Sequence, residues 1–424
     1  MEGKQTAIVL GGTAPHIALL ENLKDRGYYT VLIDYYENPF AKQIADQHLQ
    51  ESTLDKEKVL QIAIELEAKL VISTSIDQAN ITACYVSEKL GLSLPYSYET
   101  SLKVTDKGTM KGIMKRYGIP TSKHVLVGCY SDFENSDLSF PIVVKPADAT
   151  GSKGVRKASN IQQVKKYLQE AIVISRSKKA VIEEYNLGVE VQADFFIQKG
   201  IPHLIMLREK NRLVLKEDAV LQSIGSTIPV HLSQEAIVKI KHVADQLTSV
   251  FNLDTTSLFV QLNVNGNDIK VIEFACRIGG GLSYKMIKLI TGFDILDATI
   301  DSFLGNPVVI NSLPPDFFYA TRLIYTFGGM LGRIQGHEQL VSDGVIEEFF
   351  VLKKKNAEIG TDLSSQNRVG AFIVRADSKE ELTSKINSAI STLEVIDLQG
   401  NNVMRKDVYS ENISISEPNY SLRK

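Results

Sequence analysis

A glycine-rich segment that follows an apolar run combines a lysine with a loop that could lie over phosphate groups. The segment reads Phe140-Pro-Ile-Val-Val-Lys-Pro-Ala-Asp-Ala-Thr-Gly-Ser-Lys-Gly-Val155. Its apolar start predicts a strand that ends at Lys145, and the small residues after it predict a loop. Exposed backbone N–H groups and a lysine ammonium can together bind negative oxygens. The string GxxxxGKS or GxxxxGKT of a Walker loop is absent, and a hairpin turn with a surface lysine is the alternative reading.

A second apolar run leads into acidic residues. It reads Ala180-Val-Ile-Glu-Glu-Tyr-Asn-Leu-Gly-Val-Glu190. A strand edge beside an apolar cleft can offer backbone N–H and C=O groups to a heterocyclic base, and the carboxylate of Glu190 can accept hydrogen bonds from hydroxyl groups. Glu183 or Glu184 could equally be a charged residue at an exposed strand end.

The most informative pattern is a predicted hairpin with polar residues inside both strands. The strands are Leu258-Phe-Val-Gln-Leu-Asn-Val and Lys270-Val-Ile-Glu-Phe-Ala-Cys-Arg-Ile-Gly-Gly-Gly281, joined around Asn265-Gly266. This turn puts Gln261 and Glu273 on neighbouring strands. Oxygen ligands that converge from two strands suit Mg²⁺, which leaves other coordination positions to substrate phosphates. Arg277 follows the second strand and supplies a guanidinium for phosphate or carboxylate oxygens.

The elements before these segments alternate between strands and helices. Apolar periodicity predicts strands at 6–10, 28–34 and 70–73, with helices at 17–26, 59–68 and 79–90 between and after them. This order predicts a parallel sheet covered by helices over residues 1–100. The glycine turn at Gly11-Gly12 lacks the GxGxxG spacing, so we predict a tight turn and no NAD site.

The rest of the chain predicts two mixed units. Residues 101–303 combine a helix at 106–117, mostly strands up to residue 190, a helix at 236–251 and the hairpin. Residues 304–424 alternate strands with one helix near 379–393. The positive residues of Leu-Arg-Glu-Lys-Asn-Arg are Arg208, Lys210 and Arg212. They are predicted to lie on a solvated strand edge, and contact with an acidic group of the substrate is the alternative.

Taken in order, these segments resemble the ATP-grasp superfamily, on the side that includes biotin carboxylase, carbamoyl-phosphate synthetase and the L-amino-acid ligases. The resemblance covers about residues 5–400. It implies an α/β protein with a Rossmann-like, biotin-carboxylase-like domain at 1–100 and an α+β ATP-grasp domain at 101–303. A mobile lid over about 121–190 belongs to the second domain, and a C-terminal α+β domain follows at 304–424.

The resemblance also assigns roles to individual residues. ATP would contact Lys107, Lys145, Thr150, Gly151, Ser152, Gly154, Ile182, Glu183, Tyr185 and Glu190. Gln261 and Glu273 match the metal-ligand pair as carbamoyl-phosphate synthetase has it. Arg277 matches the arginine that steadies the transferring phosphate, and Lys145 is its catalytic partner. The implied cofactors are ATP and Mg²⁺, with Mn²⁺ as the alternative ion.

One position departs from the family pattern. The usual string at the second metal ligand is Glu-x-Asn-Pro-Arg, whereas this chain has Glu273-Phe-Ala-Cys-Arg277. The side chain of Ala275 cannot coordinate a metal. Members that resemble L-amino-acid ligases carry small residues there before an arginine and a glycine run, and the string Ile278-Gly-Gly-Gly281 resembles that branch.

The activity that the resemblance implies is an ATP- and Mg²⁺-dependent carboxylate–amine ligase that works through an acyl phosphate. A bicarbonate-using carboxylase of the purine-pathway or biotin type would have the same nucleotide site. A third reading is a regulatory protein that binds ATP without turnover, because the asparagine is lost.

Composition limits the partners. The chain has 424 residues, 44% of them apolar and 23% charged, as in a globular protein of several domains. Its formal charge of −3 gives no broad field for nucleic acid or anionic lipid. Cys84, Cys129 and Cys276 lack the close spacing of zinc or redox sites, and no segment approaches the ~20 apolar residues of a membrane span. We expect a cytoplasmic protein with small-molecule carboxylate and amine substrates, no nucleic acid or membrane partner, and, by analogy with relatives, a homodimer.

Overall fold

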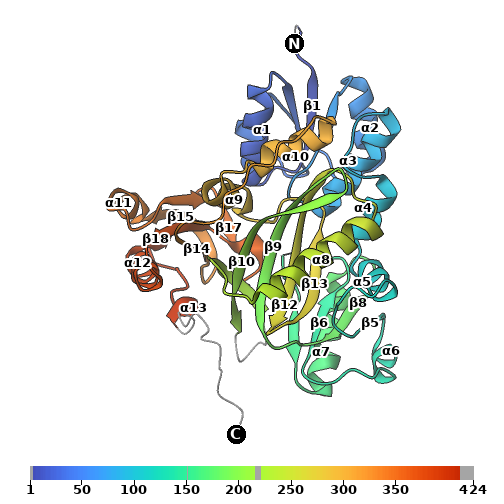
Figure 1. The fold of residues 1–424 in the computed structure, drawn as a ribbon. Coiled ribbons are helices and arrows are strands. Elements are labelled where there is room, and N and C mark those ends of the chain that lie inside the picture. Colours follow the sequence, from blue (N-terminus) through green and yellow to red (C-terminus); the bar gives the residue numbers. More distant parts are fainter. Residues whose placement is uncertain (1–2, 150, 215–220, 411–424) are drawn as a thin grey trace.

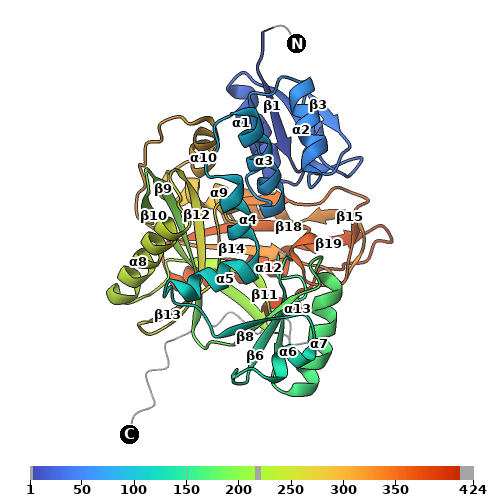
Figure 2. The same cartoon turned by 90° about the vertical axis from the view of Figure 1, so that its right-hand side faces the viewer.

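The computed structural model describes residues 3–149, 151–214 and 221–410, which form a parallel sheet, a small lid and a large antiparallel sheet (Figure 1). The mixed α/β class predicted from the sequence is confirmed. Figure 2 shows the parallel sheet and the lid at opposite ends of the molecule, with the large sheet between them.

The N-terminal sheet is parallel, as predicted, with the strand order β3-β2-β1-β4. Its elements are β1 (Thr6–Leu10), α1 (Pro15–Asp25), β2 (Tyr29–Ile33), a 3-10 turn (Phe40–Gln43), β3 (Gln47–Leu49), α2 (Lys56–Glu65), β4 (Leu70–Ile72) and α3 (Asp77–Leu90). Strand β1 is buried because helices cover the sheet, and this explains its continuous apolar run. The N–H of Gly12 in the glycine turn donates to Asp34 Oδ2 at 2.7 Å, so this carboxylate closes the turn.

Two helices connect this sheet to the lid. They are α4 (Tyr98–Thr105) and α5 (Lys107–Arg116). The lid contains β5 (His124–Val127), α6 (Tyr130–Glu134), β6 (Ile142–Pro146), β7 (Arg156–Ala158), α7 (Ile161–Ile174) and β8 (Ala180–Glu184), with the strand order β5-β8-β6-β7. Helix α7 packs on its own small core with Val164, Leu168 and Ala171. The expectation that strands dominate up to residue 190 was wrong for this helix.

The large sheet has eight strands in the order β13-β12-β9-β10-β11-β14-β18-β16. The first part of this sheet and its helices are β9 (Val189–Gln198), β10 (Ile201–Val214), β11 (Leu221–Ile228), α8 (Gln234–Val250), β12 (Thr256–Asn265), β13 (Asp268–Ala275), α9 (Ser283–Thr291) and α10 (Ile295–Leu304). The predicted hairpin is confirmed as β12 and β13. Because β11 pairs with β14, the sheet continues across the predicted domain boundary at residue 304, and that boundary stays a prediction.

The C-terminal part adds further strands to the large sheet and a three-stranded sheet in the order β17-β15-β19. Its elements are β14 (Phe318–Ile324), β15 (Gly329–Gln335), α11 (His337–Ser342), β16 (Glu348–Val351), β17 (Glu358–Ile359), a 3-10 turn (Ser365–Asn367), β18 (Gly370–Ala376), α12 (Lys379–Thr392), β19 (Glu394–Asp397) and α13 (Asp407–Ser410). Its core is continuous with that of the N-terminal sheet.

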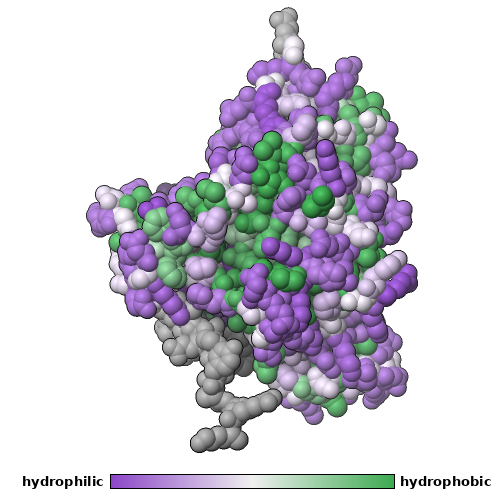
Figure 3. All heavy atoms as spheres, viewed as in Figure 1, coloured by the Kyte–Doolittle hydropathy of each residue, from purple (hydrophilic) through white to green (hydrophobic). Residues whose placement is uncertain are grey.

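The surface shown in Figure 3 is mostly hydrophilic, with a hydrophobic area near α10 and α9. None of the helices in the described part of the chain is long and apolar enough to cross a membrane.

Candidate nucleotide and metal site

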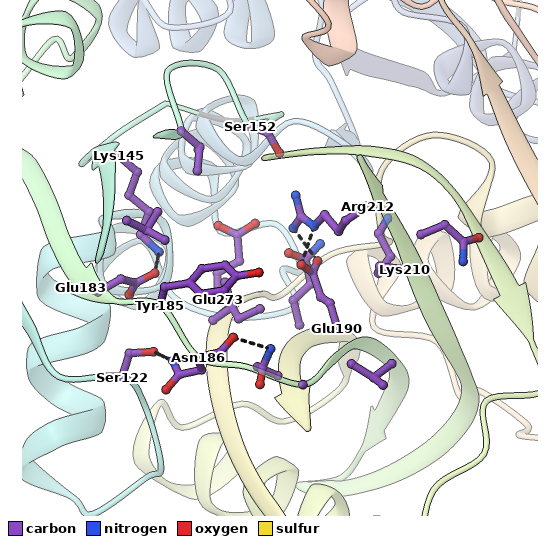
Figure 4. Close-up of a pocket in the computed structure, with 18 of the residues that line it drawn as sticks. Ser122, Lys145, Ser152, Glu183, Tyr185, Asn186, Glu190, Lys210, Arg212 and Glu273 are labelled. Carbon is purple, nitrogen blue, oxygen red and sulfur yellow. Dashed lines mark hydrogen bonds and ion pairs between the residues drawn. The ribbon is translucent and has the colours of Figure 1, made fainter. Parts of the chain in front are cut away.

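A cavity of about 730 Å³ lies between the lid and the large sheet. Lid residues of β6, its glycine-rich loop and β8 line one side, and residues of β10, β12 and β13 line the other. Figure 4 shows side chains from both sides pointing into this space. The sequence-predicted residues that line it are Lys107, Lys145, Gly151, Ser152, Glu183, Tyr185, Glu190, Gln261 and Glu273. The fold therefore brings together segments that are far apart in the chain.

Three ionised side chains meet at the lid side of the cavity. Glu183 Oε1 lies 2.5 Å from Lys145 Nζ, and Glu183 Oε2 lies 2.7 Å from Lys111 Nζ. Burial raises the pKa of Glu183, but attraction to the two lysines outweighs it and holds this pKa at about 2. Burial lowers the pKa of Lys111 to about 8 despite Glu183. Glu183 thus fixes Lys145 at the cavity wall, and Lys111, which the sequence analysis missed, is its second, fully buried partner.

The connector after β8 is held rigidly against the large sheet. Asn186 Nδ2 donates to Ser122 Oγ at 2.5 Å, and Lys270 Nζ donates to Asn186 Oδ1 at 3.0 Å. Gly188 has φ of +135°, and a Cβ there would lie 2.4 Å from the carbonyl oxygen of Val264, so only glycine fits. The polar groups of this connector are therefore held in place beside the cavity.

Tyr185 and Ile182 have different positions in the site. In Figure 4 the ring of Tyr185 lies in the middle of the lining residues, and Lys157 Nζ is 4.0 Å from its centroid. Ile182 is fully buried within β8 and is not among the residues that line the cavity. Its side chain belongs to the lid core.

The glycine-rich loop contacts Lys107. Lys107 Nζ donates to the carbonyl oxygen of Ala149 at 2.6 Å. Gly151 and Ser152 line the cavity, whereas Gly154 packs beside Ile174, whose Cδ1 would lie 2.7 Å from a Cβ at that glycine. The predicted contact of Thr150 lies outside the described residues. The described residues on both sides of position 150, which include Ala149, Gly151 and Ser152, therefore line the cavity.

Gln261 and Glu273 are direct partners on neighbouring strands. Both line the cavity, and Lys107 Nζ lies 3.7 Å from Glu273 Oε2. An amide oxygen and a carboxylate on one face suit Mg²⁺, which needs only one or two protein ligands when phosphates supply others. No cluster of three or more His, Cys, Asp or Glu side chains that could hold a metal occurs in the part of the chain that the structure describes. The pair thus fits a metal that is shared with a substrate.

Arg277 faces a neighbouring, smaller cavity of about 50 Å³. This cavity shares Lys107, Gly151 and Glu273 with the larger one. The guanidinium is bound by Asp77 at 2.6 and 2.7 Å. Arg277 therefore lies near Glu273 but is not among the residues that line the larger cavity.

The positive residues of β10 are not on a solvated strand edge, so that prediction was wrong. Arg208 is 4% exposed, with its Nε 3.3 Å from Asp194 Oδ2 and its Nη2 2.6 Å from Ser283 Oγ. Arg212 forms an ion pair with Glu190, and both line the cavity. The error arose because β10 is an inner strand of the large sheet, which its charged sequence did not suggest.

Lys210 lines the same cavity and gives a testable pH dependence. Burial lowers its pKa to about 7, and Arg208 and Arg212 add to this effect against the attraction of Glu190. The ammonium form therefore dominates below pH 7 and is lost above it. If ATP phosphates contact this ammonium, the Kd of Mg·ATP should rise about tenfold from pH 6 to pH 8. Calorimetry should show this rise in the wild type and in the exposed control Lys241→Met. A Lys210→Met variant with the same rise would contradict the assignment.

Comparisons with known proteins identify a domain in the middle of the chain. Residues 138–285 match the model of the ATP-grasp domain. Human mitochondrial carbamoyl-phosphate synthase [ammonia] is 27% identical over 180 residues, which are 42% of this chain and only 12% of that protein. The formate-dependent phosphoribosylglycinamide formyltransferase of Mannheimia succiniciproducens is 24% identical over 396 residues, covering 88% of this chain and 92% of the relative.

A solved structure shows the same fold over almost the whole chain. The L-amino acid ligase from Bacillus licheniformis superposes with a TM-score of 0.76 at 17% identity, covering 93% of this chain and 99% of that one. Residues 138–285 of this chain are therefore an ATP-grasp domain, and the fold around them is that of the ATP-grasp ligases.

Proposed function

We propose that this protein is an ATP- and Mg²⁺-dependent ligase that activates a carboxylate as an acyl phosphate and joins it to an amine. The observation that carries the proposal is the direct pairing of Gln261 with Glu273 on the wall of a cavity that Lys107 and Lys145 also line. Oxygen ligands for a cation and ammonium groups for phosphates thus lie around one space large enough for a nucleotide and a second substrate.

The residues that line the cavity support a set of proposed nucleotide contacts. The connector at residues 184–188 would hold adenine, Glu190 would accept hydrogen bonds from ribose hydroxyls, and the loop with Gly151 and Ser152 would cover the phosphates. Glu190 already binds Arg212, so its carboxylate is oriented before a ligand arrives. Lys107 and Lys145 would neutralise phosphate oxygens.

The proposed chemistry proceeds in two displacements. A carboxylate oxygen attacks the γ-phosphorus of ATP, and ADP leaves with the electrons of the broken P–O bond. The amine then attacks the acyl carbon, loses a proton and displaces inorganic phosphate. Mg²⁺, held by Gln261 and Glu273, would neutralise charge on the phosphate oxygens. Lys145 and Arg277 would bind the transferring phosphoryl group, and the lid would keep water from the acyl phosphate.

The proposal is tested by measuring ADP and phosphate release from ATP across pairs of amino acids and small carboxylates, with bicarbonate and formate included. Release that needs both a carboxylate and an amine, stops in EDTA and returns with excess Mg²⁺ is the expected result. Release with bicarbonate and an amine in place of other acids would favour the carboxylase reading. ATP binding without release for any pair would contradict the ligase and favour the regulatory reading.

The division at residues 100 and 303, the cytoplasmic location and the homodimer remain predictions. Gel filtration with light scattering would measure the oligomeric state directly.

A further inference from the structure

Arg277 is held by a carboxylate that comes from helix α3, 200 residues earlier in the chain. Its Nε donates to Asp77 Oδ1 at 2.6 Å, and its Nη2 donates to Asp77 Oδ2 at 2.7 Å. Its Nη1 donates to the carbonyl oxygen of Ile278 at 2.8 Å. The guanidinium carbon lies 5.0 Å from the centroid of the Phe259 ring. Two parallel hydrogen bonds and a ring contact leave the guanidinium one orientation.

Both partners of this ion pair are ionised and shielded from water. The Asp77 and Arg277 side chains are 17% and 12% exposed. Burial raises the pKa of Asp77, but attraction to Arg277 outweighs it and leaves the pKa below its usual value. Burial lowers the pKa of Arg277, but attraction to Asp77 raises this pKa by more, so it lies above its usual value. Removing the carboxylate would therefore leave a poorly solvated guanidinium without its counter-ion.

The position of the pair connects it with the proposed chemistry. Asp77 is the first residue of α3, the helix that follows strand β4 of the parallel sheet. The pair lines the smaller cavity together with Lys107 and Glu273, which also line the larger one. Arg277 follows β13, the strand that carries Glu273, so a fixed guanidinium lies beside the metal-ligand pair.

We propose that Asp77 is a positioning residue for the reaction: its carboxylate fixes the Arg277 guanidinium next to Glu273, so that the N-terminal sheet helps to build the phosphoryl-transfer site. The inference rests on the proposed ligase function. Asp77 itself touches no substrate in this mechanism. It acts by presenting the remaining N–H groups of Arg277 in one direction, and catalytic groups lose rate steeply when their orientation is lost.

The test compares Asp77→Asn, Asp77→Glu and the exposed control Asp25→Asn in the substrate pair that gives turnover. We expect Asp77→Asn to lower kcat about 10²-fold, with the Kd of Mg·ATP within about twofold of wild type. Asp77→Glu keeps the charge and should recover part of kcat. In an Arg277→Lys background, Asp77→Asn should have little further effect, because the carboxylate acts through the native guanidinium.

Other outcomes would overturn the inference. An unchanged kcat with a lower unfolding temperature would make the pair a structural brace between the sheets. An undiminished effect of Asp77→Asn in the Arg277→Lys background would show that Asp77 does not act through Arg277. If Asp77→Asn does not fold by circular dichroism, Asp77→Glu decides: a kcat that is partly lowered without any change in stability supports positioning, and wild-type kcat contradicts it. A wild type without turnover for any pair refutes the ligase together with the positioning, whereas an active wild type with an equally active Asp77→Asn refutes only the positioning.

Discussion

Replacing Glu273 by glutamine is expected to lower the rate of phosphate release by roughly 10³-fold or more, because one group then loses two functions. The carboxylate is the only charged member of the pair that would hold Mg²⁺, and its strand partner Gln261 has a neutral amide. Its Oε2 also lies 3.7 Å from Lys107 Nζ, so the substitution changes the charge around a lysine that we propose to bind phosphate. The fall should appear mainly in kcat, with a higher Mg²⁺ concentration needed for half-maximal rate.

The matched control is Glu338→Gln, which changes an exposed glutamate of α11. Rates measured by phosphate release at rising Mg²⁺ separate the two roles of Glu273. If the variant regains the wild-type rate at high Mg²⁺, the carboxylate contributes affinity for the metal alone. A variant with the wild-type rate at low Mg²⁺ would contradict the placement of the metal.

The pairing of Gln261 with Glu273 could be predicted only in part. The Asn265-Gly266 turn places the two on neighbouring strands, and regular pairing outward from Asn265 and Asp268 puts residue 261 (265 − 4) opposite residue 272 (268 + 4). Gln261 and Glu273 would then face opposite sides of the sheet, because side chains alternate along a strand. The register shifts between Gln261 and Leu262, and this irregularity brings the two side chains to one face. No feature of the local sequence indicates this shift in strand register.

Helices were predictable where their buried face is apolar. Helix α3 was predicted at 79–90 and runs from Asp77 to Leu90. Helix α4 was missed because its buried face includes Thr100 and Ser101, which give no apolar period. The sequence does contain an N-cap residue at the start of α4, because Ser97 is a serine. In the structure its side chain accepts a hydrogen bond from the N–H of Thr100 at 3.1 Å.

Helix α7 had two signals that the sequence analysis left unused. The Asn160 side chain accepts from the N–H of Gln163 at 3.0 Å, as an N-cap does. Val164, Leu168 and Ala171 follow with the spacing of one helix face, and all three are buried. The sequence therefore contained the pattern of a helix, and α7 was missed because strands were expected in this segment.

Partners brought together only by tertiary structure could not be predicted. Lys111 lies in the helix predicted at 106–117, and Asp77 lies just before the helix predicted at 79–90; their roles depend on Glu183 and Arg277. Lys111 did stand out in one respect, because it lies beside the buried Met110 and one turn before Met114 on α5. A lysine on an apolar helix face needs a buried counter-ion, but the sequence does not say which acid provides it.

Replacing Glu183 by alanine is expected to lower the free energy of unfolding by about 3–5 kcal/mol, since the change leaves the buried ammonium groups of Lys111 and Lys145 without their counter-ion. The chain contains no tryptophan, so circular dichroism in urea is the suitable measurement. Glu134→Ala, at an exposed position in the same lid, should change stability by no more than about 0.5 kcal/mol. If Glu183→Ala loses as little stability as this control, the two lysines must be solvated when Glu183 is absent.

The pH dependence of this loss identifies the ionised carboxylate as its cause. The pKa of Glu183 is lowered to about 2 in the folded protein, from an ordinary value of 4.5. Its stabilising contribution is therefore complete above pH 4.5 and declines as the pH falls toward 2. The difference in free energy of unfolding between wild type and Glu183→Ala should become smaller when unfolding is measured at pH 5, 4 and 3. A difference caused by lost packing alone would not change with pH.

A triple variant, Glu183→Leu with Lys111→Met and Lys145→Met, should regain much of the stability because none of these three positions then carries a buried charge, yet it should not regain ATP binding. That result would show that these three side chains have two separate roles. Their mutual charges stabilise the fold, and Lys145 binds the nucleotide.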